Sequence, residues 1–338
     1  MKLFGFALGV ATLLAGQDPP PPPPPATAGP TFEEFVAGVR AEALKRGISE
    51  ATLDRALTGL QPEPVVVARD RAQPELVQSL DEYLERRLSA RTIANAREMA
   101  TRHAKLLRQV DEKYGVPPPL MIAIWGLESN FGVFTGSYPT ISALATLAYD
   151  GRRALFRSEL FAALAIVEQK KIEPAALKGS WAGAMGQPQF MPSSFLKHAV
   201  DFDEDKDIDI WTSMADVFGS MANYLQAAGW RDGERWGREV RISRTVMAKI
   251  DRSVGMRSGG CRAMRELTTA RSLDTWRELG VTLTGGQALP KAEMSASLVR
   301  GNKRHFLVYR NYEAILSYNC SNSYAVSVGM LSDRIGPK

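Results

Sequence analysis

One glutamate at the end of an apolar run has the surroundings of a catalytic acid. Glu128 closes the segment Leu120–Leu127, one helical turn after Ile124 and two turns after Met121, so it shares a helix face with apolar side chains. Burial on that face would raise the pKa of its carboxyl and keep it protonated near neutral pH, as a general acid requires. The pattern predicts an acid in a cleft. The alternative is an ordinary glutamate near a helix C-terminus.

A run of aspartates is the second chemical feature. The five occupy alternate positions, as oxygen ligands do in the calcium loop of an EF-hand: Asp201, Asp203, Asp205, Asp207 and Asp209. Lys206 stands at the glycine position of that loop and Thr212 at the position of its closing glutamate, while Asp216 could close a longer loop. Structural calcium and a solvated acidic loop therefore both stay open, with Asp201, Asp203, Asp205, Asp207 and Asp216 as the candidate ligands.

The remaining reactive residue types point to no other chemistry. The three histidines, His103, His198 and His305, have no metal-ligand spacing, so we expect no zinc site. Neither standard glycine-rich phosphate loop occurs. The two cysteines, Cys261 and Cys320, could form one disulfide in an exported protein, but the sequence does not establish that their geometry fits.

Several longer motifs occur together with Glu128. They are Glu128–Gly132 (ESNFG), Tyr149–Arg153 (YDGRR), Gly179–Ser194 (GSWAGAMGQPQFMPSS), Asn223–Tyr224 before Gly229–Trp230, Tyr318–Asn319 and Tyr324–Ala325. In this order they resemble the B-type lytic murein transglycosylases, glycan-cleaving enzymes with a lysozyme-like core. The resemblance extends from about Phe32 to Ile335. Pro188, before Gln189, and Cys320, after the Tyr-Asn pair, depart from the family pattern without removing a catalytic group.

The resemblance implies a role for each matched residue. Glu128 would act first as acid and then as base, with no cofactor required. The implied sugar-binding residues are Arg152, Arg153, Ser180, Gln189, Tyr224, Tyr318, Asn319 and Tyr324. Guanidinium, amide and hydroxyl groups can hydrogen-bond sugars, and aromatic rings can stack on them. The alternatives are a solvated helix start for the arginines and core packing for the tyrosines.

The resemblance also implies the reaction. The enzyme would cut the β-1,4 bond between N-acetylmuramic acid and N-acetylglucosamine in peptidoglycan and leave a 1,6-anhydromuramic end, without consuming water. Most glycosidases need two carboxylates, and only one stands out here. The competing functions are a hydrolytic muramidase and a catalytically silent peptidoglycan-binding scaffold protein.

The elements that position these residues are mainly helical. Thr31 and Glu34 predict a capping box that starts the first helix, and Gly47 should end it. We expect Val65–Val67 to be extended after Pro62 and Pro64. Further helices are predicted over 48–60, 89–114, 155–169 and 213–228, and strands over 239–242 and 306–309. The fold class is α+β, predominantly helical.

The N-terminal segment has the pattern of an export signal. Met1–Lys2 gives a positive end, Leu3–Ala15 is apolar, and no lipoprotein cysteine follows. We expect a soluble periplasmic protein, with an uncleaved N-terminal anchor as the alternative. The predicted division is 1–16 signal peptide, 17–30 proline-rich linker, 31–115 helical region, 116–235 lysozyme-like core with the EF-hand-like loop, 236–310 small mixed region, and 311–338 a segment that returns to the cleft.

Composition sets only broad limits on partners. The 338 residues are 45% hydrophobic and 23% charged, which is ordinary globular composition, and the net charge of +5 favours acidic partners without choosing among them. The predicted partners are peptidoglycan glycan strands and periplasmic wall-synthesis proteins. We expect no nucleic acid binding and a monomer.

Overall fold

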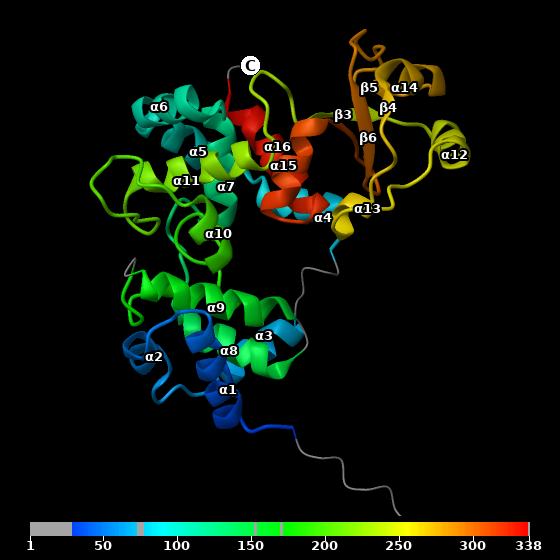
Figure 1. The fold of residues 1–338 in the computed structure, drawn as a ribbon. Helices are drawn as coiled ribbons and strands as arrows, with labels where there is room; N and C mark the ends of the chain where they lie inside the picture. The colour runs from blue at the N-terminus through cyan, green and yellow to red at the C-terminus, as the bar shows by residue number, and fades with distance from the viewer. Residues whose placement is uncertain (1–28, 73–77, 152–153, 170–171, 337–338) are drawn as a thin grey trace, which may run out of the picture.

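The computed structural model describes residues 29–72, 78–151, 154–169 and 172–336 (Figure 1). The predicted signal peptide, and the proline-rich linker except for its last two residues, lie outside the described residues. None of the described helices is long and apolar enough to cross a membrane.

The described residues form sixteen α-helices and seven short strands, which confirms the predicted α+β, mainly helical class. The helices up to the middle of the chain are α1 (Phe32–Lys45), α2 (Glu50–Leu57), α3 (Pro64–Ala72), α4 (Leu80–Arg87), α5 (Ala90–Arg102), α6 (Ala104–Tyr114), α7 (Pro118–Ser129), α8 (Thr140–Asp150) and α9 (Ala154–Glu168). The later helices are α10 (Pro192–His198), α11 (Met214–Ala227), α12 (Arg244–Ser253), α13 (Arg262–Arg265), α14 (Leu273–Leu279), α15 (Arg310–Tyr318) and α16 (Asn322–Ile335). The strands are β1 (Tyr138–Pro139), β2 (Lys178–Gly179), β3 (Gly237–Arg241), β4 (Arg271–Ser272), β5 (Thr282–Leu283), β6 (Ser295–Arg300) and β7 (His305–Val308).

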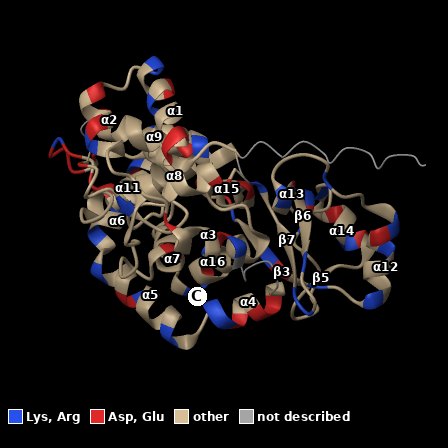
Figure 2. Ribbon diagram, turned by 90° about the horizontal axis from the view of Figure 1, so that it is seen from below, with Lys and Arg blue, Asp and Glu red and all other residues tan. Residues whose placement is uncertain are grey.

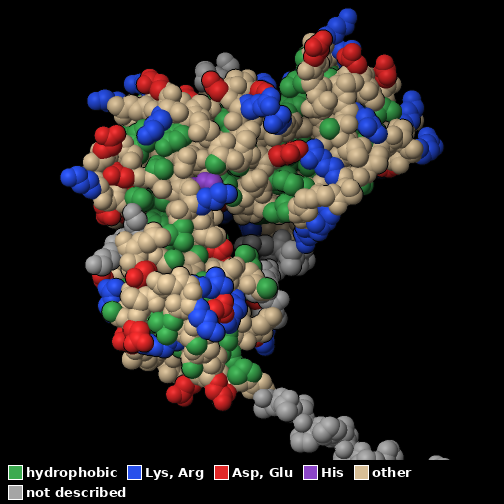
Figure 3. All heavy atoms as spheres, viewed as in Figure 1, with side chains coloured by type: hydrophobic (Ala, Val, Ile, Leu, Met, Phe, Trp, Pro, Cys, Tyr) green, Lys and Arg blue, Asp and Glu red, His purple; other side chains and the backbone are tan. Residues whose placement is uncertain are grey.

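Three hydrophobic cores organise these elements. The first core joins α1, α2 and α3 to the hairpin of α8 and α9, in the lower part of Figure 1. The second core surrounds α7 with α4, α5, α6, α11, α15 and α16. The third core lies between the sheet and helices α12 and α14. In the same view, Figure 3 shows the surface indented between the part around the first core and the parts above it.

The sheet of the third core is antiparallel throughout, with strand order β4-β6-β7-β3-β5. Leu298 pairs with Leu307 in its centre, and both side chains are fully buried. The predicted strands 239–242 and 306–309 correspond to β3 and β7. Strands β1 and β2 form a separate antiparallel pair of two residues each, which ties residue 138 to residue 179.

Two cap predictions are confirmed. The Thr31 hydroxyl accepts from the Glu34 amide and the Glu34 carboxylate accepts from the Thr31 amide, which completes the capping box of α1. Gly47, the predicted end of α1, follows the C-cap residue Arg46 with a left-handed φ of 84°, and Gly115 ends α6 in the same conformation, with φ of 64°.

The predicted extended segment Val65–Val67 is wrong, because these residues lie in α3. Pro64 occupies the first turn, where its missing amide is not needed. The Glu63 amide donates to the Thr146 hydroxyl on α8, and Val66 is completely buried. Packing against α8 therefore overrides the strand preference of three successive valines.

The predicted single helix over 89–114 is also wrong, because α5 and α6 are separate helices. His103 lies between them with φ of −101° and ψ of 12°, outside helical geometry. Its ring packs edge-on against Trp125 and Phe218, with centroids 5.6 Å away in both cases. Because the chain turns at His103, the amphipathic helices α5 and α6 both pack against the second core. A single straight helix over 89–114 would extend past this core.

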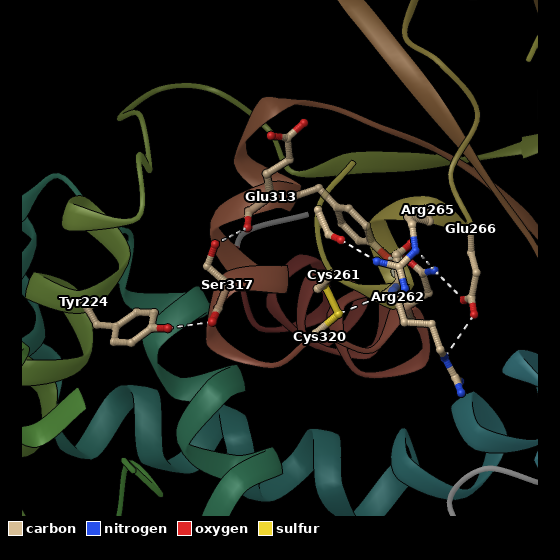
Figure 4. The surroundings of a disulfide bond; sticks show 12 residues. Tyr224, Cys261, Arg262, Arg265, Glu266, Glu313, Ser317 and Cys320 are labelled. Atoms are coloured by element: carbon tan, nitrogen blue, oxygen red, sulfur yellow. Dashed lines mark hydrogen bonds and ion pairs between the residues drawn. A yellow bond between two sulfur atoms is a disulfide. The ribbon is translucent and has the colours of Figure 1, made fainter. Parts of the chain in front are cut away.

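A disulfide joins the segment before α13, which packs against the second core, to the link between the two C-terminal helices. Cys261 precedes α13, and Cys320 lies in the short link between α15 and α16 (Figure 4). Beside the bridge, the Asn322 side-chain amide donates to the Ala263 carbonyl at 2.9 Å and to the Glu266 carboxylate at 3.1 Å. The link after Tyr318 is thus fixed from one side by covalent and polar contacts.

We expect the paired substitution Cys261→Ser and Cys320→Ser to lower the free energy of unfolding by about 2–4 kcal/mol, because the bridge closes a loop across 59 positions of sequence. Denaturant titration of both proteins under non-reducing conditions measures the difference. Wild-type protein kept in reductant is the control and should match the double variant. Equal stability of the oxidised protein and the variant would show that the bridge constrains nothing.

Candidate active site

The site is built around the C-terminal end of α7. Every residue from Leu120 to Leu127 is buried, and Glu128, one residue before the helix ends, is the first that is partly exposed. Figure 2 shows that charged residues cover the outer faces of α5 and α12 but are nearly absent from α7. An interior helix of this kind must be apolar on all sides, and it carries its one carboxyl to the edge of the second core.

The motif after Glu128 ends this helix sharply. Asn130, Phe131 and Gly132 adopt positive φ angles of 49°, 59° and 81° in succession. The Ser129 hydroxyl donates to the Trp125 carbonyl and accepts from the Gly132 amide, and the Ser129 carbonyl accepts from the Phe134 amide at 2.9 Å. These bonds satisfy backbone groups that a buried helix end would otherwise leave unpaired.

A glycine-rich hairpin, residues 179–190, packs against this turn. A side chain on Gly136 would lie 1.9 Å from the Gly179 carbonyl carbon, so the two backbones touch directly. The Trp125 indole N–H donates to the Gln187 side-chain oxygen at 2.7 Å, and the Gln187 amide donates to the Trp211 carbonyl. The position of Glu128 is therefore fixed by α7, by its terminal turn and by the hairpin.

The two predicted sugar-binding residues of this hairpin serve its geometry as well. Ser180 is partly exposed, and its hydroxyl accepts from the Ala184 amide at 3.1 Å. Gln189 has a φ of 53°, and its side-chain amide donates to the Gly186 and Thr135 carbonyls. The Gln189 amide oxygen makes no protein hydrogen bond among the described contacts, so it is the atom of this residue that can meet a ligand.

The predicted tyrosines Tyr224 and Tyr318 lie together between the first and second cores. Their ring centroids are 4.9 Å apart, and both rings pack against Phe190. The Tyr224 hydroxyl donates to the Ser317 carbonyl at 2.6 Å, as Figure 4 shows, and the Tyr318 hydroxyl donates to the Pro188 carbonyl at 2.7 Å. Pro188, a departure from the family pattern, thus supplies an acceptor within the site.

Two tyrosine hydroxyls are electrostatically coupled to Glu128. Burial, followed by the charge of Glu128, raises the pKa of Tyr318 and of Tyr324 well above the usual value. For Tyr324 a hydrogen bond with Glu128 contributes further, yet no partner within the described residues meets strict hydrogen-bond geometry at its buried hydroxyl. Both phenols remain protonated, but the Tyr318 proton is donated to the Pro188 carbonyl, so Tyr324 is the one of the two that can donate toward the carboxyl.

A neighbouring pocket of about 390 Å³ contains predicted and unpredicted residues. Asn319 and Tyr324 were expected in a cleft and line it together with Cys320. Tyr83 on α4 also lines it and contributes to the electrostatics of Tyr324, although nothing in the linear sequence distinguishes Tyr83 from a packing residue. Arg152 and Arg153 lie outside the described residues.

The acidic loop brings some of its predicted ligands together. Carboxylate oxygens of Asp201, Asp203 and Asp205 lie within 4.8 Å of one another. Asp207 is outside this group, and both oxygens of Asp216 accept backbone amides, from Phe202 and Asp209. Lys206 adopts the left-handed φ of 78° at the position where an EF-hand has glycine.

Comparison with known sequences adds a family assignment. Residues 31–333 match the profile described as "Transglycosylase SLT domain". The chain is 33% identical over 234 residues to the membrane-bound lytic murein transglycosylase B of Escherichia coli K12. That alignment covers 68% of this chain and 60% of the relative, so the chain spans less than two thirds of that protein's length.

Solved structures agree with this assignment. SltB3 from Pseudomonas aeruginosa, in complex with NAG-NAM-pentapeptide, superimposes with a TM-score of 0.80 at 40% identity, over 90% of this chain and 79% of that one. The same protein with NAG-anhNAM-pentapeptide gives 0.78 at the same identity and coverage. The Escherichia coli lytic transglycosylase Slt35 in complex with calcium gives 0.72 at 27% identity, over 90% and 92%. The lysozyme-like fold of these neighbours confirms the predicted architecture of the core.

The contact between Gly136 and Gly179 gives a test of this rigid site. Gly136→Ala should lower the free energy of unfolding by more than about 3 kcal/mol, because the methyl group would overlap backbone atoms that cannot move aside. Gly229→Ala is the matched control: its φ of 92° is also left-handed but the space around it is open, so its cost should be about 1 kcal/mol. Denaturant titration measures both, and equal losses would refute close packing at Gly136.

Proposed function

The chain belongs to the transglycosylase SLT domain family, and from that membership we propose that it is a lytic transglycosylase of the bacterial cell wall. It cleaves the β-1,4 bond between N-acetylmuramic acid and N-acetylglucosamine and leaves a 1,6-anhydromuramic end. The ligands named for the SltB3 structures, a NAM-containing and an anhydroNAM-containing pentapeptide, are the substrate and product types that this reaction relates.

The observation that carries the proposal is a single carboxyl in the right surroundings. Glu128 lines a pocket of about 290 Å³, and it is the one acidic residue among the described residues that line this pocket. Burial, and after it the charge of Glu128, raises the pKa of the phenols of Tyr318 and Tyr324. A site with one carboxyl suits a reaction in which the same group acts as acid and then as base, whereas most hydrolysing glycosidases use two carboxylates.

The proposed reaction proceeds in two steps. Glu128 donates its proton to the bridging oxygen while the C1–O bond of the muramic unit breaks, and the N-acetyl group of that unit stabilises the developing positive charge at C1. The Glu128 carboxylate then removes the proton of the C6 hydroxyl as O6 bonds to C1. Glu128 is protonated again, the departing sugar has gained a hydroxyl, and no water has been consumed.

The Tyr324 phenol supports the first step. A tyrosine hydroxyl that stays protonated can donate toward the carboxylate formed after the first step, which lowers the energy of that ionised state. We propose sugar contacts for Arg152, Arg153, Ser180, Gln189, Tyr224, Tyr318, Asn319 and Tyr324. The hydroxyls of Tyr224 and Tyr318 are occupied by backbone carbonyls, so their rings are the parts we expect to face sugar.

We further propose that the acidic loop binds one structural calcium ion. The oxygens of Asp201, Asp203 and Asp205 converge, which fits the oxygen donors that calcium prefers. The Slt35 structure named for its calcium complex supports the assignment. Asp207 and Asp216 fit less well, since their carboxylate oxygens are not part of this converging group.

The proposed setting follows from the substrate. We propose that the protein is exported to the periplasm and acts there as a monomer on glycan strands, in reach of wall-synthesis proteins. The predicted domain bounds also remain proposals, with the lysozyme-like core at 116–235 and the mixed region at 236–310.

Mass spectrometry of digested peptidoglycan tests the reaction. Wild-type protein should release anhydromuropeptides, and Glu128→Gln, which keeps the shape and removes the acid, should lower their yield by at least about a thousandfold. Glu98→Gln on the exposed face of α5 is the control and should retain activity. Reducing ends from the wild type would indicate a muramidase, and no product from either protein would indicate a binding scaffold.

Thermal unfolding tests the calcium site. Saturating Ca²⁺ should raise the unfolding temperature by roughly a few degrees, since an ion that binds only the folded state stabilises it by mass action. Asp203→Asn should abolish the rise. Asp207→Asn, in the same loop but outside the carboxylate group, should retain it. A rise that is the same for both variants, or that Mg²⁺ reproduces, would refute this site.

A further inference from the structure

The pocket beside Glu128 contains two arginines that the proposed reaction does not use. Arg86 and Arg87, at the end of α4, line it together with Thr92 of α5 and with Asn130 and Phe134 after α7. Its volume is about 290 Å³, comparable to a small-ligand cleft. The pocket is thus open to a part of the substrate next to the bond that Glu128 would cleave.

Neither arginine forms an ion pair with a carboxylate among the described residues. The Arg87 Nη2 donates to the Leu127 carbonyl at 2.6 Å, which satisfies one orphan carbonyl at the end of α7. The Arg87 Nε is buried and has no hydrogen-bond partner in the described parts of the chain. Arg86 is exposed. The guanidinium carbons of Arg86 and Arg87 lie 5.9 and 5.8 Å from the centroid of the Tyr83 ring.

The rim of the same pocket is apolar and held in place. The Val133 and Phe134 side chains are 65% and 67% exposed, among the most exposed large apolar side chains of the protein. The loop that carries them is fixed, because the Phe134 amide bonds to the Ser129 carbonyl and the Gln189 side chain bonds to the Thr135 carbonyl. A rigid, exposed aromatic ring at a site mouth is a surface on which a sugar can stack.

We propose that this pocket binds a sugar unit that carries a carboxylate, with Phe134 against the sugar face and Arg86, supported by Arg87, against the carboxylate. Guanidinium groups match carboxylates in geometry and charge, and an aromatic ring matches the C–H face of a pyranose. In peptidoglycan the carboxylate is either the lactyl group of muramic acid or part of the stem peptide. The proposal rests on the proposed function and names the feature of the glycan that this site recognises.

Binding to an inactive protein tests the recognition apart from catalysis. The probes are labelled glycan strands without stem peptides and strands with them, each with free carboxylates or with carboxylates converted to methylamides. Their Kd values are measured at low salt in the Glu128→Gln background, with and without Arg86→Gln. Wild-type turnover of the same strands is followed separately, so absence of anhydro ends would overturn the proposed function without affecting the binding result.

We expect the Glu128→Gln protein to bind free carboxylates about threefold to tenfold more tightly than methylamides, a range suited to a partly exposed charged contact. Arg86→Gln should bring that ratio close to one. A loss on bare strands assigns the lactyl carboxylate, and a loss confined to peptide-bearing strands assigns the stem peptide. An unchanged ratio on both kinds of strand overturns the proposal.

Two further variants separate recognition from general effects. Arg102→Gln, on the exposed surface of α5 where Arg102 pairs with Glu98, is the matched control and should keep the ratio. Phe134→Ala should weaken binding of free and amidated strands equally, because stacking does not depend on the carboxylate. If Arg102→Gln lowers the ratio as much as Arg86→Gln, the preference reflects net charge and the assigned pocket is wrong.

Discussion

The structure depends on one constraint: an apolar helix must deliver a carboxyl to the edge of a core and end there. Helix α7 is buried along nearly its whole length, so its last turn needs internal partners for its backbone groups. The Ser129 hydroxyl, three consecutive residues with positive φ, and the Arg87 side chain provide the turn and the partners. Glu128 is placed by this ending, and the rest of the site is arranged around it.

The site forms where separate parts of the chain meet. Tyr318 packs against both the first and the second core, and its hydroxyl bonds to the hairpin that follows β2. The segment that carries Tyr318, Asn319 and Tyr324 belongs to the C-terminal helices and is attached by the disulfide to the segment before α13. The cleft is therefore assembled from segments nearly two hundred residues apart in sequence, and the stability of each core contributes to its geometry.

Several motif residues have structural roles beside the sugar contacts that we propose for them. Gln189 and Ser180 hold the hairpin through backbone bonds, and Tyr224 and Tyr318 use their hydroxyls on main-chain carbonyls. The aromatic and amide surfaces that remain are what a glycan can meet. Such pre-organisation reduces the cost of ordering side chains when a ligand binds. It also explains why residues of these types recur in ordered motifs rather than scattered along the chain.

The sequence by itself determined the local features. The apolar period around Glu128, the capping box at Thr31 and the left-handed Gly115 each depend on neighbours within one or two turns, so they could be read from residue types. The convergence of three aspartates in the acidic loop is local for the same reason. The ordered motifs also predicted the family, which the match over residues 31–333 confirms.

Only the tertiary structure decided what depends on distant partners. Val65–Val67 are helical because Val66 is buried where α3 packs against α8, and the helix predicted over 89–114 breaks at His103 because that ring packs on Trp125 and Phe218. Tyr83 and Arg86 of α4 and Phe134 after α7 line the pockets near Glu128, and Cys261 meets Cys320 across the chain. Burial energy acts through space rather than along the sequence, so such contacts leave no local pattern from which they could be predicted.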